Sequence, residues 1–173
     1  MEIVIGNRIP MDYFITAGVG SSDNDRHAGS FHLALRDAGI ENCNIIRYSS
    51  ILPSIANKID KRYPIIHGEV AECIIAEANG EIREQISAGI IYGWLYDENN
   101  NRYGGLVCER ANNSSEIDLI KDLKTSLNEL YVNGYSHFDI RDIEIQTKSM
   151  VGDKKYNTVI VALVFQTYKI ELM

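Results

Sequence analysis

Long runs of β-branched, aliphatic and aromatic residues constrain the fold of this 173-residue chain more than any other feature. Such runs, bounded by Gly, Asn, Asp and Pro, are typical of β-strands. The last run is apolar at consecutive positions around its centre, which predicts a strand covered on both faces. The predicted strands are Asp12–Ala17, Asn42–Tyr48, Ile65–Glu77, Gln85–Tyr96, Tyr103–Arg110, Phe138–Met150 and Tyr156–Tyr168.

Turn-forming residues predict where the chain leaves these strands. Asn79 and Gly80 lie between two apolar runs, as is typical of a hairpin. The shift in alternation from Ile140 to Ile143 predicts a bulge near Arg141. The remaining connections are expected to be loops, turns or irregular chain: Gly18–Gly29, the stretch from Pro53 to Ile65, Asp97–Arg102 and Gly152–Asp153.

The longest helix is predicted for Ser115–Asn133. Ser115 and Asp118 have the spacing of a capping box, and Gly134 is expected to end the helix. Apolar residues recur at helical spacing and predict one buried stripe. The predicted stripe consists of Ile117, Ile120, Leu123, Leu127, Leu130 and Tyr131.

A second, shorter helix is predicted for Ser30–Ala38, with Ser30 as its cap and Gly39 as the left-handed residue after its end. Many strands with only two helices favour an α+β fold over a doubly wound one. We therefore expect a layered αββα-type sandwich of mostly antiparallel strands with two main helices. Residues 1–173 are expected to form a single domain.

Composition argues against several classes of protein. The net charge of -7 disfavours nucleic-acid binding, which requires clustered Lys and Arg. The N-terminus does not match a secretory signal, and no apolar segment approaches the roughly 20 residues that span a bilayer. Cys43, Cys73 and Cys108 are widely spaced and odd in number, which disfavours a disulfide framework or a zinc site. We expect a cytoplasmic protein without a metal site.

The most specific indication of function lies in residues 40–53, which read IENCNIIRYSSILP. An Asn-x-Asn run leads through a short strand to a Ser-Ser pair, two apolar residues and a proline. This segment resembles the processing segment of the pyruvoyl-dependent arginine decarboxylase family. Thr16–Asp23 and Gly104–Arg110 match the same family in order and spacing, the latter like its Gly-x-x-x-x-Glu strand. The likeness covers nearly the whole chain.

The resemblance implies that the chain cuts itself between Ser49 and Ser50. Decarboxylation of an amino acid leaves a carbanion at Cα, and a carbonyl that forms a Schiff base with the substrate amine accepts those electrons. In this family the hydroxyl of the second serine attacks the preceding carbonyl. The resulting ester eliminates to dehydroalanine, which hydrolyses to a pyruvoyl group and ammonia. Residues 1–49 would become the β chain, and residues 50–173 the α chain with the pyruvoyl cofactor at its start.

The resemblance also implies roles for three other groups. Asn44 would support cleavage and hold the substrate together with the new carboxylate of Ser49, because an amide can donate to an oxyanion or a carboxylate. Glu109 would protonate Cα after carbon dioxide leaves. Its apolar neighbours Val107 and Cys108 predict partial desolvation and a raised pKa. The alternatives are a solvated Ser-Ser turn, a turn-forming asparagine and a solvent-facing glutamate.

The sequence departs from the family where the substrate's side chain is bound. The family carries an aspartate that binds the guanidinium, and the corresponding residue here is His32. Histidine cannot make the charged, two-pronged contact of a carboxylate. Either another acid substitutes, with Asp25 and Asp37 nearest in sequence, or the substrate is not arginine. The nearby basic residues Arg26 and His27 make a substrate with an acidic or neutral side chain conceivable.

Three hypotheses follow from these residues. The first is an arginine decarboxylase that forms agmatine, for acid resistance or polyamine supply. The second is the same chemistry on histidine, aspartate or another amino acid, and the third is an unprocessed, non-catalytic scaffold. By family resemblance we expect a small-molecule amino-acid substrate and a homo-trimer or hexamer with sites between protomers. No nucleic-acid or membrane partner is expected.

Overall fold

The computed structural model describes residues 5–61 and 65–172 of the chain. Strands account for most of its regular structure, and a π-helical turn, Arg26–Phe31, leads directly into the shorter of two α-helices. The elements in chain order are β1 (Ile5–Pro10), β2 (Asp12–Ser22), α1 (His32–Asp37), β3 (Asn44–Arg47), β4 (Ile51–Pro53), β5 (Asn57–Lys58), β6 (Val70–Gly80), β7 (Gln85–Tyr96), β8 (Arg102–Asn112), α2 (Glu116–Gly134), β9 (Asp139–Val151), β10 (Tyr156–Phe165) and β11 (Tyr168–Leu172).

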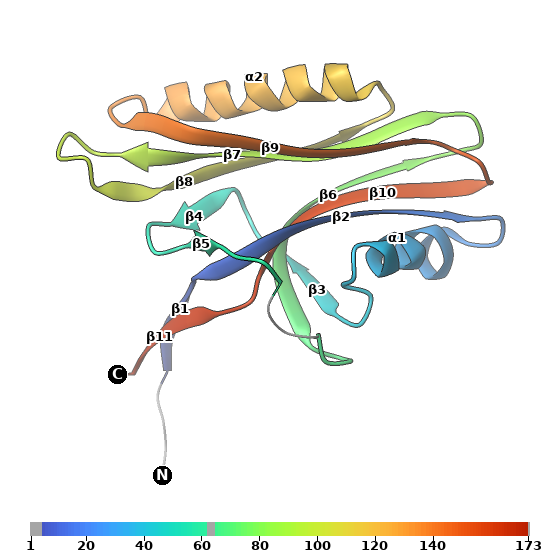
Figure 1. Cartoon of the computed structure of the whole chain (residues 1–173), viewed down its shortest axis with the longest axis horizontal. Coiled ribbons are helices and arrows are strands. Elements are labelled where there is room, and N and C mark those ends of the chain that lie inside the picture. Colours follow the sequence, from blue (N-terminus) through green and yellow to red (C-terminus); the bar gives the residue numbers. More distant parts are fainter. Residues whose placement is uncertain (1–4, 62–64, 173) are drawn as a thin grey trace, which may run out of the picture.

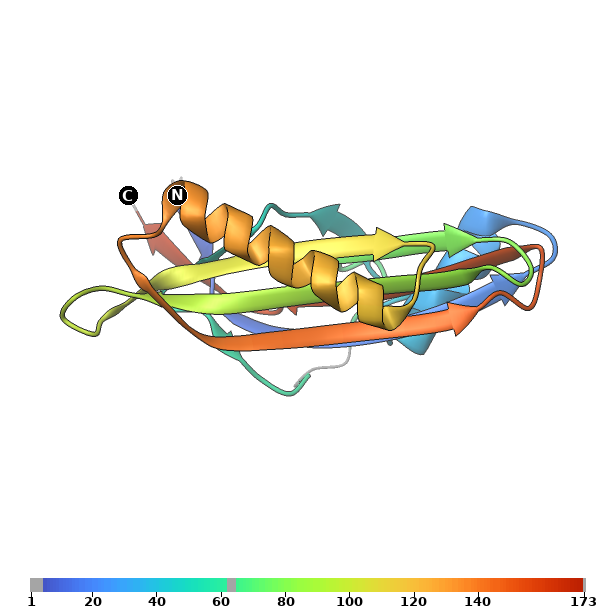
Figure 2. The same cartoon turned by 90° about the horizontal axis from the view of Figure 1, so that it is seen from above.

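Two β-sheets pack face to face, and a helix covers the outer face of each (Figure 1). The five-stranded sheet has the order β3-β6-β10-β2-β5 and carries α1, whereas the four-stranded sheet has the order β4-β8-β7-β9 and carries α2. Seen from above, α2 crosses its sheet diagonally (Figure 2). Within both sheets the strand pairs are antiparallel except β3 with β6 and β2 with β5. This architecture confirms the predicted αββα-type sandwich.

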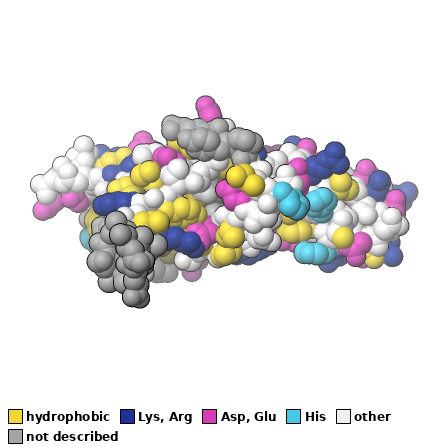
Figure 3. All heavy atoms as spheres, turned by 90° about the horizontal axis from the view of Figure 1, so that it is seen from below, with side chains coloured by type: hydrophobic (Ala, Val, Ile, Leu, Met, Phe, Trp, Pro, Cys, Tyr) yellow, Lys and Arg dark blue, Asp and Glu magenta, His cyan; other side chains and the backbone are white. Residues whose placement is uncertain are grey.

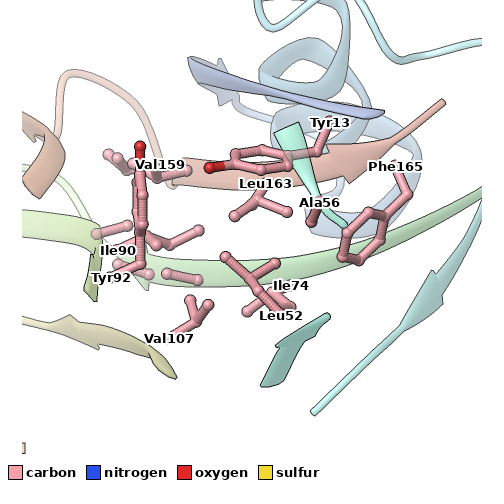
Figure 4. Close-up of a cluster of buried hydrophobic side chains, with 14 of the residues drawn as sticks. Tyr13, Leu52, Ala56, Ile74, Ile90, Tyr92, Val107, Val159, Leu163 and Phe165 are labelled. Carbon is pink, nitrogen blue, oxygen red and sulfur yellow. The ribbon is translucent and has the colours of Figure 1, made fainter. Parts of the chain in front are cut away.

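The main apolar core lies between the two sheets. β10 passes through the middle of the five-stranded sheet, and each of its residues from Asn157 to Phe165 is buried, which confirms the predicted strand with both faces covered. Smaller clusters fill the space beneath α1 and beneath α2. The inner core includes Tyr13, Leu52, Ile74, Ile90, Tyr92, Val107, Val159, Leu163 and Phe165 (Figure 4).

The predicted loop Gly18–Gly29 is wrong over its first part, because β2 continues through it. A Cβ atom added to Gly18 would come within 2.1 Å of the Ala34 carbonyl oxygen, and one added to Gly20 within 2.1 Å of the Ser30 carbonyl oxygen. The absence of side chains therefore lets the helical segment lie directly on the strand. These glycines serve close packing and form no turn.

The predicted start of the short helix at Ser30 is also wrong. The helical segment begins earlier, at a π-helical turn capped by Asp25, whose carboxylate accepts a hydrogen bond from the Ala28 backbone N–H at 2.6 Å. Ser30 is fully buried, and its hydroxyl bonds with that of Thr158 at 2.9 Å. Gly39 has a φ of 70°, which confirms the predicted left-handed residue after the helix.

The predicted hairpin at Asn79–Gly80 is wrong as well. Both residues belong to β6, where Gly80 pairs with Asn157, and the chain then crosses to β7 in the other sheet. The turn at Gly152 is a second crossing, from β9 to β10. The two crossings are joined, because the Arg83 N–H donates to the Gly152 carbonyl at 2.7 Å. Gly152 and Asp153 lie at a reversal as predicted, whereas Asn79 and Gly80 do not, and neither pair indicates which sheet follows.

The predicted strand Tyr156–Tyr168 is interrupted at Gln166 and Thr167. Beyond this break, β11 pairs with β1 in a two-stranded ribbon that projects from the sandwich (Figure 1). The Met11 backbone N–H donates to the Thr167 carbonyl at 2.9 Å, so both partners leave the sheet together.

The long helix follows its prediction at both ends but not along its whole buried face. The Ser115 hydroxyl accepts a hydrogen bond from the Asp118 N–H at 3.2 Å, which confirms the cap, and Gly134 is the last helical residue. Ile117 is 68% exposed, so its place in the predicted stripe was wrong. The fully covered positions are Leu119, Leu123 and Leu127.

Predictions about irregular backbone had mixed outcomes. The bulge near Arg141 is confirmed, because the register between β7 and β9 shifts between the Trp94–Arg141 and Tyr92–Glu144 pairs. The stretch expected to be irregular after Pro53 contains β5, and its residues 62–64 lie outside the described residues. Residues 1–4, on which the expectation about a secretory signal partly rests, also lie outside them.

Candidate active site

The Ser49–Ser50 bond lies where the chain crosses from one sheet to the other. β3, before it, belongs to the five-stranded sheet, and β4, after it, belongs to the four-stranded sheet. The Tyr48 N–H donates to the Cys73 carbonyl at 2.8 Å, and the Val107 N–H donates to the Ser50 carbonyl at 2.9 Å. The segment is therefore held at one end by β6 and at the other end by β8.

The carbonyl group of Ser49 has its own hydrogen-bond donor. The Ile51 N–H donates to the Ser49 oxygen at 3.0 Å, which closes a γ-turn centred on Ser50. Such a donor favours negative charge on the oxygen when a nucleophile attacks the carbonyl carbon. No residue type marks this donor in advance, because any non-proline residue carries a backbone N–H.

Glu109 lies on β8, two residues beyond Val107. It pairs with Ile90, whose side chain lies in the core between the sheets, so Glu109 projects from the same face. The side chain is partly buried, and burial raises the pKa of Glu109, opposed in part by a backbone hydrogen bond and by the charges of Arg110 and Arg47. The predicted desolvation is therefore confirmed.

Asn44 and His32 lie together at a depression of about 700 Å³ between the α1 segment and β3. Histidine side chains gather on the face that carries α1 (Figure 3). The Asn44 side-chain amide donates to the Gly68 carbonyl at 3.1 Å. The depression, named here the helix pocket, is also lined by His27, Phe31, Glu41 and Arg47.

The predicted site residues thus fall into two groups within one chain. Ser49, Ser50 and Glu109 lie at or near the crossing between the sheets, and none of them lines the helix pocket. Arg47 connects the two groups, because it lines the pocket and its charge acts on Glu109. Sequence reasoning missed Arg47, although it lies only two residues before Ser49.

The two acids proposed from sequence as substitutes for the family's aspartate are engaged elsewhere. Asp25 caps the helical segment, and the Asp37 carboxylate accepts a hydrogen bond from the Val19 N–H at 3.0 Å. Neither lines the helix pocket. Both carboxylates therefore serve the contact between the helix, its leading turn and β2.

The described part of the chain contains no group of three or more His, Cys, Asp and Glu side chains that could hold a metal ion. None of the helices in that part is long and apolar enough to cross a membrane.

A family model described as pyruvoyl-dependent arginine decarboxylase matches residues 12–170. The pyruvoyl-dependent arginine decarboxylase of Methanopyrus kandleri is 30% identical over 91% of this chain and 97% of its own length. Pyruvoyl-dependent arginine decarboxylase 1 of Methanosarcina acetivorans is 28% identical over 94% and 99%. The probable pyruvoyl-dependent arginine decarboxylase of Chloroherpeton thalassium is 34% identical over 57% of this chain, which spans only 54% of that relative.

The fold and the site define a layered α+β protein with a Ser-Ser pair at the crossing between its sheets. The chain belongs to the pyruvoyl-dependent arginine decarboxylase family. Membership implies a covalently bound pyruvoyl group as cofactor.

Proposed function

We propose that the chain is a self-processing decarboxylase that converts arginine to agmatine and carbon dioxide. The observation that carries this proposal is the hydrogen bond from the Ile51 N–H to the Ser49 carbonyl, at the bond that the family resemblance assigns to cleavage. The relatives named pyruvoyl-dependent arginine decarboxylase support arginine as the substrate.

Self-cleavage uses groups of the chain and one water molecule. The Ser50 hydroxyl adds to the Ser49 carbonyl carbon, and the C–N bond breaks to give an ester and a free amine on residue 50. Elimination then breaks the Cβ–O bond of residue 50, which leaves a carboxylate on Ser49 and dehydroalanine at residue 50. Addition of water with loss of ammonia gives the ketone. The Ile51 N–H stabilises the oxyanion of the first step.

The residues around this bond fit a pyruvoyl group. The Ser50 carbonyl is already fixed by the Val107 N–H, so residue 50 stays attached to β8 after cleavage. The pyruvoyl group supplies an electrophilic carbonyl and an electron sink for decarboxylation. Glu109 holds a proton at higher pH than an ordinary glutamate, because burial raises its pKa, and it donates this proton to Cα. Asn44 and the new Ser49 carboxylate orient the substrate.

The separation of the two residue groups supports an oligomer. We propose a cytoplasmic homo-trimer or hexamer in which the helix pocket of one protomer meets the Ser50 region of another. Asn44 and His32 line the helix pocket, whereas Glu109 and Ser50 do not. Size-exclusion chromatography with light scattering measures the number of protomers.

A second candidate substrate class follows from the lining of the helix pocket. His27 and His32 both line it, and an imidazole gives a guanidinium no charged, two-pronged contact, which favours a neutral or acidic side chain over a guanidinium. Release of carbon dioxide from histidine or aspartate, but not from arginine, would replace the first proposal by this one.

Intact mass spectrometry of purified protein tests the proposal. We expect two masses, for residues 1–49 and for residues 50–173 with Ser50 converted to a pyruvoyl group, in which a keto oxygen replaces the amine and the side-chain hydroxyl is lost. Ser50→Ala lacks the attacking hydroxyl and is expected to stay one chain. A wild-type chain of full, unmodified mass that resists ketone reagents would instead indicate an unprocessed scaffold. A panel of amino acids assayed for carbon dioxide release then identifies the substrate.

A further inference from the structure

The helix pocket has one carboxylate that no other part of the site uses. We infer that Glu41 binds the guanidinium of arginine there, in place of an acid on the helix. The inference rests on the proposed function and names the residue that determines its specificity for a basic side chain. It assigns the recognition of the substrate's charge to the turn between α1 and β3.

Glu41 is the only acid among the described residues that line the pocket. Its side chain is partly buried, and across residues 5–61 and 65–172 it forms no ion pair and no hydrogen bond. The other charged group in the lining, Arg47, is paired with Glu77. The pocket therefore presents one carboxylate whose charge is not compensated by a neighbouring cation in the described structure.

The rest of the lining suits the uncharged part of an arginine side chain. Phe31, Leu35 and Ile45 supply apolar surface for three methylene groups. His27 stacks on Phe31 with ring centroids 5.7 Å apart, so a flat aromatic surface borders the space. A planar guanidinium binds a carboxylate through two parallel N–H donors and also stacks on aromatic rings. An acidic substrate side chain would meet the like charge of Glu41.

The acids on the helical segment do not compete for this role. The Asp25 carboxylate is used as a cap and the Asp37 carboxylate accepts from Val19, as described above. His32 lines the same pocket as Glu41, so an acid at either position would reach the same space. Exchange between these two positions is therefore a direct test.

The first experiment measures steady-state kinetics of processed protein with Glu41→Gln, which keeps the shape and removes the charge. We expect kcat/KM for arginine to fall about 10- to 100-fold, mainly through KM, because a contact made equally in ground and transition states changes KM. Mass spectrometry should give the two wild-type fragments. The matched control is Asp37→Asn, which removes a nearby charge outside the pocket and keeps an oxygen for the Val19 N–H.

A second experiment separates recognition from turnover. Calorimetric titration with agmatine, which has the guanidinium but no carboxyl group to lose, should give a dissociation constant 10- to 100-fold higher for Glu41→Gln than for wild type. The double variant His32→Asp, Glu41→Gln should recover most of this loss, because it returns a carboxylate to the pocket.

The outcomes distinguish this inference from the proposed function. Equal agmatine affinity and equal KM for arginine in wild type and Glu41→Gln would overturn the role of Glu41 and leave arginine decarboxylation standing. A wild-type protein that binds agmatine through Glu41 but releases no carbon dioxide from arginine would contradict the proposed function alone. Loss of affinity that His32→Asp does not restore would indicate a structural role for Glu41 and would also count against the inference.

Discussion

Glu109 is a carboxyl group whose surroundings make its proton hard to remove. Burial raises its pKa, and the nearby charges of Arg110 and Arg47 oppose this only in part. A general acid acts only while it is protonated. We therefore expect kcat of the wild-type enzyme to fall as the pH rises through the pKa of Glu109, and a pH–rate profile measures this fall.

Glu109→Gln is expected to lower kcat about 10²- to 10⁴-fold and to abolish that limb of the pH profile, because the amide carries no transferable proton. Formation of the two fragments should persist, since cleavage is assigned to other groups. Glu98→Gln, in an exposed loop, is the control and should behave as wild type. Unchanged kcat in Glu109→Gln would remove Glu109 from the mechanism.

The same raised pKa has a consequence for stability. The folded chain holds the Glu109 proton more tightly than the unfolded chain does, so this group favours folding below its ordinary pKa. That contribution is lost as the pH rises through the raised value.

Single residues could be proposed from the sequence where side chains would carry the chemistry. Ser49, Ser50, Glu109 and Asn44 were proposed from a string of residue types in a fixed order, and their roles stay predictions. The Ile51 N–H that contacts the Ser49 carbonyl was not, because a backbone group leaves no mark in the sequence. Nor were the roles of Arg47 and Glu41 visible, since the helix pocket exists only once α1 and β3 are packed together.

At the scale of elements, the contact between β2 and the helical segment depends on missing side chains. A methyl group on Gly20 would lie 2.1 Å from the Ser30 carbonyl oxygen and 2.5 Å from the Ala34 nitrogen, so the backbones would have to separate. We expect Gly20→Ala to lower the free energy of unfolding by about 1–3 kcal/mol or more. Denaturant titration of the uncleaved Ser50→Ala chain, with and without the change, measures the difference.

Gly134→Ala provides the matched control for that prediction. Gly134 is helical, and a Cβ atom there would meet no atom within 4 Å. Alanine should therefore raise the free energy of unfolding by about 0.5–1 kcal/mol, because glycine loses more backbone entropy on folding. Equal effects of the two substitutions would contradict the close contact between strand and helix.

Elements were predicted well where one local signal dominated. The limits of β7 follow from a continuous apolar run. The Ser115 cap follows from a hydroxyl three residues before the backbone N–H that donates to it. Gly18 and Gly20 led to the wrong prediction of a loop, because glycine favours turns locally but also permits close approach between layers. The Asn79–Gly80 pair led to the wrong prediction of a hairpin, since the pairing of both residues with β10 outweighs their preference for a turn.

At the scale of the whole molecule, the N-terminal piece is interleaved with the rest of the fold. β2 pairs with β10 from Tyr13 to Ser22, and β3 pairs with β6. We therefore expect residues 1–49 and 50–173 to remain one particle after cleavage. Native size-exclusion chromatography followed by denaturing electrophoresis should find both fragments in a single peak.

The uncleaved Ser50→Ala protein is the reference for that elution volume. Loss of the shorter fragment from the native peak would contradict the expected association.

The layered class was predictable from the alternation of strands and two amphipathic helices. The assignment of β6 and β7 to different sheets was not, because strand partners are decided by contacts between segments that lie far apart in the chain, such as β6 with β10.

The position of the Ser49–Ser50 link between two layers has a consequence for the finished catalyst. Cleavage there would leave one new chain end at each sheet. The carboxylate of Ser49 would lie beside β6, and the keto group of residue 50 would lie beside β8. The spacing between the group that orients a substrate and the group that reacts with it would then be a property of how the layers stack. Substitution of Leu52 or Ile74, which are buried between the sheets, would then change kcat by changing how the two layers pack.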